Sequence, residues 1–132
     1  MGGSIKGDRV STTELGELQQ ALRQFAAERE WEQFHSPKNL AMALAGEAGE
    51  LLEHFQWLTE TESYALNATA MVAVSEELAD IFLYLIRLAD RLSVDLPAVA
   101  REKIRINAAK YPIEKARGNS RKYKEFKLEA EK

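Results

Sequence analysis

The sequence contains no cysteine, and this absence removes several classes of site at once. A chain without thiols forms no disulfides, binds no metal through thiolates and has no cysteine nucleophile. The absence fits a protein of the cytoplasm, where disulfides are rare. Long apolar runs are also missing. The first ten residues lack the apolar core of a secretory signal, and the most apolar stretch, residues 81–92, is interrupted by charges and too short to span a bilayer. We therefore predict a cytoplasmic protein without membrane association.

Positive charge is not in excess either. The net charge is −3 and the isoelectric point about 5.5, which argues against a nucleic-acid-binding surface spread over the protein. A length of 132 residues suits one domain, and 45% apolar with 30% charged residues is an ordinary globular composition. We predict a flexible N-terminus at 1–10, one domain at 11–123 and a tail at 124–132. A few helices of this size often leave apolar faces that a second subunit covers.

Two helices are expected in the first half of the chain. The first is predicted to begin at Ser11, because the sequence of residues 11–14, Ser-Thr-Thr-Glu, has the form of a capping box. Apolar residues then recur at helical spacing. The second is predicted from Ser36 and Pro37, a capping hydroxyl followed by a proline in the first turn.

Two further helices are expected in the second half. After a polar connection at residues 59–69, a third helix is predicted from about residue 70 to 92. A fourth is predicted from a cap at Asp95 to about Lys110, and Pro112 ends it. No segment shows the alternation of a strand. The predicted fold class is all-α.

Two pairs of carboxylates stand out on the second and third helices. Each pair has the spacing i, i+3, which places both side chains on one side of a helix, and each lies in an apolar part of its helix. Four inward carboxylates without a cation would cost many kcal/mol. An all-oxygen site of this charge suits a hard divalent ion, and Mg²⁺ in particular accepts substrate phosphates as further ligands. The four predicted ligands are Glu47, Glu50, Glu77 and Asp80.

These carboxylates have two other interpretations. They can form a solvated helix face, which is the better explanation of one pair alone and the poorer explanation of two similar pairs in apolar helices. A di-iron carboxylate bundle requires Glu-x-x-His on two helices. Here His54 lies four residues after Glu50, and the third helix has no histidine, so that bundle is disfavoured.

At these residues the chain resembles the MazG-like all-α nucleoside triphosphate pyrophosphohydrolases. Glu-x-x-Glu is followed after 26 residues by Glu-x-x-Asp, as in that family's signature. The resemblance extends from about Leu18 to Tyr123 and is closest to the members that hydrolyse dCTP. The matching segments are FAAEREWEQFH (25–35), PKNL (37–40), GEAGEL (46–51), FQW (55–57), EELAD (76–80) and YP (111–112).

The resemblance implies an activity and an assembly. It implies hydrolysis of a deoxynucleoside triphosphate between the α and β phosphates, with dCTP or a modified dCTP as substrate and Mg²⁺ on the four carboxylates. Glu47 or Glu50 would accept the proton of the attacking water, and spacing does not decide which. Family members are dimers or tetramers whose sites borrow residues from a neighbouring subunit, and a homotetramer is expected here.

The resemblance also assigns substrate contacts. Four residues flanking the first two helices correspond to the nucleobase pocket: Trp31, Phe34, His35 and Trp57. Taken singly, such aromatic residues are more often core or interface. On the fourth helix, Lys103, Asn107 and Lys110 share one face and suit a polyphosphate, although a solvent-exposed basic face is the alternative. The resemblance places Lys103 and Asn107 at the phosphates with Tyr84 nearby, and Tyr111 lies in a matching segment.

The sequence allows two competing functions. One changes the substrate to dUTP or a broad set of nucleoside triphosphates. The other is a helical oligomerisation module without catalysis, whose carboxylates are only surface charge.

Overall fold

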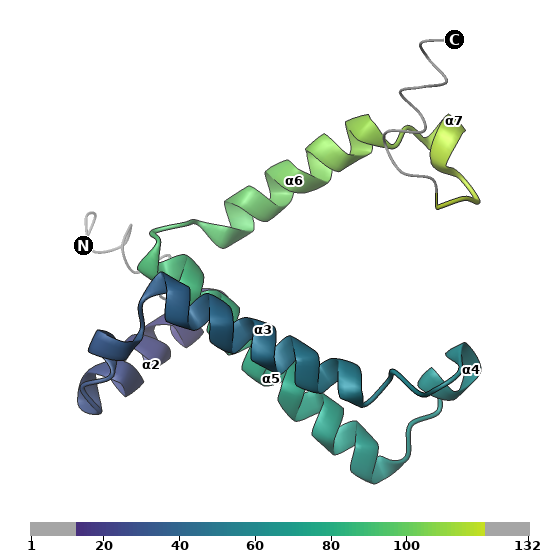
Figure 1. Ribbon diagram of the computed structural model, residues 1–132. Coiled ribbons are helices and arrows are strands. Elements are labelled where there is room, and N and C mark those ends of the chain that lie inside the picture. Colours follow the sequence, from purple (N-terminus) through teal and green to yellow (C-terminus); the bar gives the residue numbers. More distant parts are fainter. Residues whose placement is uncertain (1–12, 121–132) are drawn as a thin grey trace. The chain divides into compact units, whose positions relative to one another are not determined.

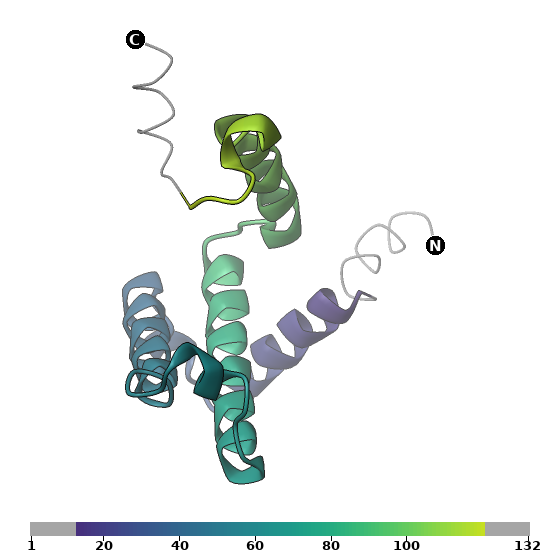
Figure 2. The same cartoon turned by 90° about the vertical axis from the view of Figure 1, so that its right-hand side faces the viewer.

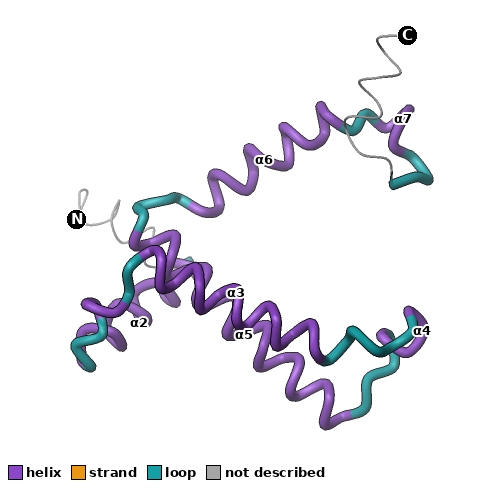
Figure 3. The backbone as a smooth tube through the Cα atoms, viewed as in Figure 1, coloured by secondary structure: helices purple, strands orange, loops and turns teal. Residues whose placement is uncertain are grey.

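The computed structural model describes residues 13–120 and confirms the all-α fold, with no strand in that range (Figures 1 and 3). The four predicted helices correspond to α2, α3, α5 and α6. The elements are α2 (Glu14–Glu28), η1 (Glu32–Phe34), α3 (Pro37–Glu53), α4 (Glu60–Ser63), α5 (Ala68–Arg91), α6 (Leu96–Lys110) and α7 (Ile113–Ala116). They form two compact units, one ending at Val94 and the other beginning at Asp95. The predicted domain limits at residues 10, 11, 123 and 124 lie outside the described residues.

The first unit is built around α3 and α5. These helices lie side by side and run in opposite directions, because α4 and its loops turn the chain back (Figure 1). In the view of Figure 2, α2 crosses α5, the helix against which it packs. The core is small and consists of Ala26, Leu40, Val74, Ile86 and Ala89.

The helix starts follow from capping side chains, and the first prediction was wrong in its position. α2 begins at Glu14, and its cap is Thr13, whose Oγ1 accepts a hydrogen bond from the backbone N–H of Gly16 at 2.9 Å. The predicted start, Ser11, lies outside the described residues. Neighbouring hydroxyls can serve the same role, so the sequence does not distinguish them. The caps of α3 and α6 are the predicted ones, Ser36 and Asp95.

The connection predicted at residues 59–69 is more structured than expected. It contains the short helix α4, closed by a true capping box in which Thr59 and Glu62 each bind the other's backbone N–H. α5 then begins at Ala68 rather than at residue 70, because Asn67 caps it through Ala70 N–H. The polar segment therefore contains both the short helix α4 and the residue that caps α5.

The described part of the second unit, residues 95–120, contains one more helix than predicted. α6 ends at Lys110 as expected, and Pro112 lies beyond it. The chain then turns once more in α7, with Pro112 at the N-cap position. Proline cannot continue a helix, but its fixed φ suits the start of a new one.

The packing of α3 and α5 leaves much apolar surface open. The exposed large apolar side chains on these two helices are Met42, Leu52, Met71, Val72, Leu78 and Phe82. An apolar surface of this kind is what a chain of this size was expected to leave. The oligomer that would cover it stays a prediction. In residues 13–120 no helix is both long enough and apolar enough to cross a membrane.

A polar cluster ties α2 to the C-terminal part of α5. Asp90, whose side chain is 9% exposed, accepts two hydrogen bonds from Arg23, at 2.7 and 2.6 Å. Gln19 donates a third at 3.0 Å, and Arg87 lies 3.6 Å away on the same helix. The hydrogen bond from Arg23 lowers the pKa of Asp90 below its usual value. This cluster adds polar contacts between α2 and α5 to those of the apolar core.

Asp90→Asn is expected to lower the free energy of unfolding by about 1–2 kcal/mol at neutral pH, because Arg87 then stays buried without a counter-charge. The loss stays modest since Arg23 is 48% exposed and water screens its pairing. Since the folded pKa of Asp90 is lowered, its contribution is complete above about pH 4 and disappears as the pH falls through that lowered value. Urea denaturation across this range measures both effects.

A matched control is Arg105→Gln, which breaks the pair of Arg105 with Glu102, exposed on both sides. Because both partners are exposed, its effect on unfolding is expected to lie within the error of the measurement. A loss for Asp90→Asn that persists unchanged in strong acid would contradict the electrostatic explanation.

Candidate metal centre

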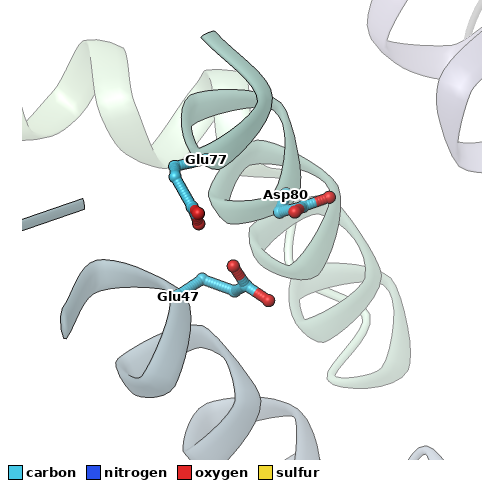
Figure 4. A group of neighbouring side chains, drawn as sticks. All are labelled: Glu47, Glu77 and Asp80. Carbon is cyan, nitrogen blue, oxygen red and sulfur yellow. The ribbon is translucent and has the colours of Figure 1, made fainter. Parts of the chain in front are cut away.

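Three carboxylates from two helices meet at the interface of α3 and α5. Glu47 projects from α3 towards Glu77 and Asp80 on α5 (Figure 4). Each of the three offers an oxygen, and these oxygens lie within 4.8 Å of one another. The antiparallel packing of the two helices brings Glu47 into this position, although 30 residues separate it from Glu77 along the chain. The group thus has the size and the ligand type of a divalent-metal site.

Two oxygens of this group are buried without a hydrogen-bond partner. One belongs to Glu47 and the other to Glu77. A cation or a proton is the partner that such oxygens require. Glu47 binds a proton more tightly than a free carboxylate: hydrogen bonding to the carboxyl of Glu77, followed by burial and the neighbouring Glu50 and Asp80, raises the pKa of Glu47 to about 7. The residues present therefore fit a divalent cation.

Glu50, the fourth predicted ligand, lies outside the three-carboxylate group. It is exposed on α3, one turn after Glu47, and near enough to raise the pKa of Glu47. His54 follows on the same helix, with its Nε2 3.9 Å from an oxygen of Glu77. In the sequence, the sign that His54 lies near the carboxylates was its i, i+4 spacing from Glu50. The sequence argument used this spacing only against a di-iron site.

The predicted nucleobase residues fall into two places. Trp31 and His35 are in edge contact, with ring centroids 6.3 Å apart, and Phe34 lies between them along the chain with an exposed ring. Phe25 of α2 packs edge-on against Trp31 at 5.6 Å. These residues form an aromatic cluster before the start of α3.

Trp57 lies beyond the opposite end of α3. That helix has 17 residues. At 1.5 Å per residue it separates the cluster before it from Trp57 after it by about 25 Å. The side chain of Trp57 is 86% exposed. One chain therefore does not close a single pocket from all four residues.

The remaining predicted contacts lie on α5 and α6. Tyr84 is one turn after Asp80 and is half-buried. The other four belong to the second unit: Lys103 and Asn107 are exposed on α6, Lys110 ends that helix and Tyr111 follows it. Their role at the phosphates stays a prediction.

The side-chain partner of His35 was not predicted from the sequence. Arg87, at 5% exposure, donates a hydrogen bond from Nε to the imidazole Nδ1 at 3.1 Å. Arg91 binds the backbone carbonyl of the same histidine at 3.0 Å. The signal in the sequence was three charged residues, two of them these arginines, inside the most apolar stretch. In the sequence, these charged residues were used only as an argument against a membrane-spanning segment.

A family model described as the MazG-like family matches residues 43–126, the segment that contains all three grouped carboxylates. The chain belongs to this family. Its relatives include human dCTP pyrophosphatase 1, 43% identical over 95% of this chain and 82% of that protein. Mouse dCTP pyrophosphatase 1 is 45% identical over 83% of this chain and 65% of its own length.

A solved structure gives the same result for the fold. The crystal structure of a pyrophosphatase from Archaeoglobus fulgidus matches with a TM-score of 0.72 and 36% identity. The match covers 76% of this chain and 94% of the archaeal one. This agreement extends the family assignment to the three-dimensional fold.

Proposed function

We propose that this protein is a Mg²⁺-dependent nucleoside triphosphate pyrophosphohydrolase that converts dCTP, or modified dCTP, to dCMP and pyrophosphate. The observation that carries the proposal is the meeting of Glu47, Glu77 and Asp80 at the α3–α5 interface. The relatives named dCTP pyrophosphatase support the substrate, because they match most of this chain. The cytoplasmic location stays a prediction from composition.

The carboxylates take separate roles in this reaction. Glu47, Glu77 and Asp80 would hold the ion, and Glu50 lies one turn further along α3. When bound there, Mg²⁺ would offset the negative charge of the triphosphate and would make water a better nucleophile. Glu50 lies outside the three-carboxylate group and is exposed, so it is the carboxylate left to accept the proton of the attacking water.

The base pocket is completed between subunits of a homo-oligomer, which we expect to be a tetramer. The separation of Trp57 from Trp31 and His35 along α3 supports this arrangement, since α3 keeps them about 25 Å apart in one chain. The apolar surface on α3 and α5 provides area for such a contact. Aromatic faces stack on the base, and His35 supplies a directional hydrogen bond.

The phosphate donors are expected on α6, where Lys103 and Asn107, spaced i and i+4, present an ammonium and an amide on one face. Lys110 and Tyr111 extend this set. Tyr84 of α5 stays a separate prediction from the resemblance. Charge-assisted donors of this kind suit a polyphosphate chain.

The decisive experiment measures pyrophosphate release from a panel of canonical and modified deoxynucleoside triphosphates, with and without Mg²⁺. We expect release that depends on Mg²⁺ and is fastest with dCTP or a 5-substituted dCTP. Similar turnover of dATP, dGTP and dCTP would contradict the cytosine preference and leave a broad pyrophosphohydrolase. No release from any nucleotide would favour an oligomerisation module without catalysis.

Mg²⁺ is expected to raise the melting temperature more at about pH 8 than at about pH 6. The reason is that the pKa of Glu47 is raised to about 7, so at the lower pH the ion must displace a proton. Without metal, the stability of the protein changes with pH in the opposite direction. The folded state binds this proton more tightly than the unfolded state, so the free energy of unfolding falls as the pH rises from 4.5 to about 7.

Differential scanning fluorimetry across this pH range, with and without Mg²⁺, measures both trends. Glu47→Gln is the control, because glutamine carries no titrating proton and should remove the difference between the two pH values. A shift with Mg²⁺ that is the same at both pH values in the wild type would contradict the role of Glu47.

A further inference from the structure

The contact between Arg87 and His35 joins a buried guanidinium to the aromatic cluster. Arg87 is on α5 and His35 precedes α3, 52 residues earlier in the chain. The donor is Arg87 Nε and the acceptor is the imidazole Nδ1, at 3.1 Å. Arg87 is itself held in place, since its Nη1 lies 3.6 Å from Asp90. This is an oriented contact made by a fixed side chain.

The chemistry of the two groups determines the position of the proton on His35. A guanidinium has only N–H donors and does not lose its proton in proteins. Nδ1 must therefore be the unprotonated nitrogen that accepts, and in a neutral ring the proton then lies on Nε2. A proton on Nδ1 would break this hydrogen bond, and protonation of both ring nitrogens would also place a second cation against Arg87.

The surroundings of His35 also favour the neutral ring. Burial lowers the pKa of His35, and the charges of Arg87 and Arg91 lower it further, while Glu32 of η1 opposes them. Arg91 also fixes the backbone, because its Nε donates to the His35 carbonyl at 3.0 Å. Ring and main chain are thus both anchored to α5.

We propose that Arg87 is a positioning residue that keeps His35 in the Nε2–H form, so that the ring offers only a hydrogen-bond donor to the nucleobase. This proposal rests on the proposed function, which places His35 in the base pocket. A fixed donor selects a base with an acceptor at the facing atom. Cytosine presents acceptors at O2 and N3, whereas uracil and thymine carry a hydrogen on N3. A site that faces a donor with a donor rejects that base, because both groups lose their partners.

The first test is the nitrogen NMR spectrum of His35 in the free protein. The chain has two histidines, so His54 serves as an internal reference. We expect the wild type to show an unprotonated Nδ1 and a protonated Nε2. In Arg87→Met the two resonances should move towards each other, because both tautomers become populated. Arg29→Gln is the matched control: it removes an arginine from the ring of Phe25 in the same cluster and should leave the His35 resonances in place.

The second test is a double-mutant cycle on dCTP hydrolysis. Arg87→Met is expected to raise KM for dCTP about fivefold with little change in kcat, as for one lost hydrogen bond. In His35→Gln, the amide NH₂ is always a donor, whereas the neutral imidazole ring has two tautomers. In that background Arg87→Met should therefore have no further effect on KM. An equal effect of Arg87→Met in both backgrounds would make Arg87 a purely structural residue and overturn the proposal.

The two tests separate the failure of this proposal from the failure of the proposed function. The NMR measurement needs neither substrate nor activity. A wild-type spectrum with the proton on Nδ1, or unchanged resonances in Arg87→Met, would overturn the proposal even in an active dCTP pyrophosphohydrolase. Absence of dCTP hydrolysis with the expected spectrum would overturn the proposed function instead. Thermal unfolding checks the fold of each variant, and the wild-type spectrum decides the tautomer if Arg87→Met does not fold.

Discussion

Glu47→Gln is expected to lower kcat for dCTP hydrolysis by about 10²–10⁴-fold while the helices stay folded. Glu47 is the carboxylate that α3 contributes to the three-residue group, and Glu77 and Asp80 both come from α5. Its replacement by a neutral amide removes one of the anionic ligands and leaves the packing of α3 on α5 almost unchanged. Pyrophosphate release at saturating dCTP and Mg²⁺ measures the loss.

The same substitution should stabilise the metal-free protein above neutral pH. Like charges and burial raise the pKa of Glu47, so its ionised form is unfavourable in the folded state. A glutamine removes that charge, and its amide can donate to Glu77. We therefore expect a higher melting temperature for Glu47→Gln than for the wild type without Mg²⁺, and the reverse order with saturating Mg²⁺. Opposite effects on activity and stability are typical of a functional site.

Glu53→Gln is the matched control, because Glu53 ends α3, is exposed and does not belong to the group. It should leave both activity and melting temperature close to the wild type. Asp80→Asn should behave like Glu47→Gln in the assay. Mg²⁺-dependent release that survives in Glu47→Gln would show that the α3–α5 carboxylates are not the metal site, and the oligomerisation module would gain support.

The secondary structure followed from the sequence wherever one side chain had a clear role. Ser36 with Pro37, and Asp95 with Pro97, marked the starts of α3 and α6 because a capping oxygen followed by proline suits a helix start. Ser11 was wrong as a start, since several hydroxyls stand together and only tertiary structure selects Thr13. The turn of α4 was missed because four residues give too little periodicity to detect.

The site was predictable in its residue types and less so in its geometry. The i, i+3 pairs put Glu77 and Asp80 on one side of α5, and the apolar surroundings indicated the inward face. Whether Glu50 reaches the same point depends on the crossing of α3 and α5, which spacing along one helix does not fix. The contact of Arg87 with His35 was beyond reach for a similar reason, because it joins segments 52 residues apart.

Trp57→Ala is expected to raise KM for dCTP by about 10–100-fold, the effect of losing one base-stacking ring. The exposure of this side chain makes the prediction informative. At 86% exposure Trp57 contributes little to the packing of its own chain, so the free energy of unfolding should change by less than about 0.5 kcal/mol. A large effect on KM then has to come from substrate or from a neighbouring subunit.

Tyr64→Ala separates these sources from a general effect of removing a surface aromatic. Tyr64 follows α4, is 93% exposed and is not among the pocket residues, so its removal should leave KM unchanged.

Light scattering on the purified variants distinguishes a role of Trp57 in base stacking from a role in oligomer assembly. A higher KM for Trp57→Ala in an intact oligomer supports a ring that stacks on the base. Dissociation of the oligomer with loss of activity would make Trp57 an interface residue, and an unchanged KM would remove it from the pocket. The spacing of about 25 Å along α3 gives this result a second meaning, since a Trp57 that contacts the same base as His35 must come from a different chain.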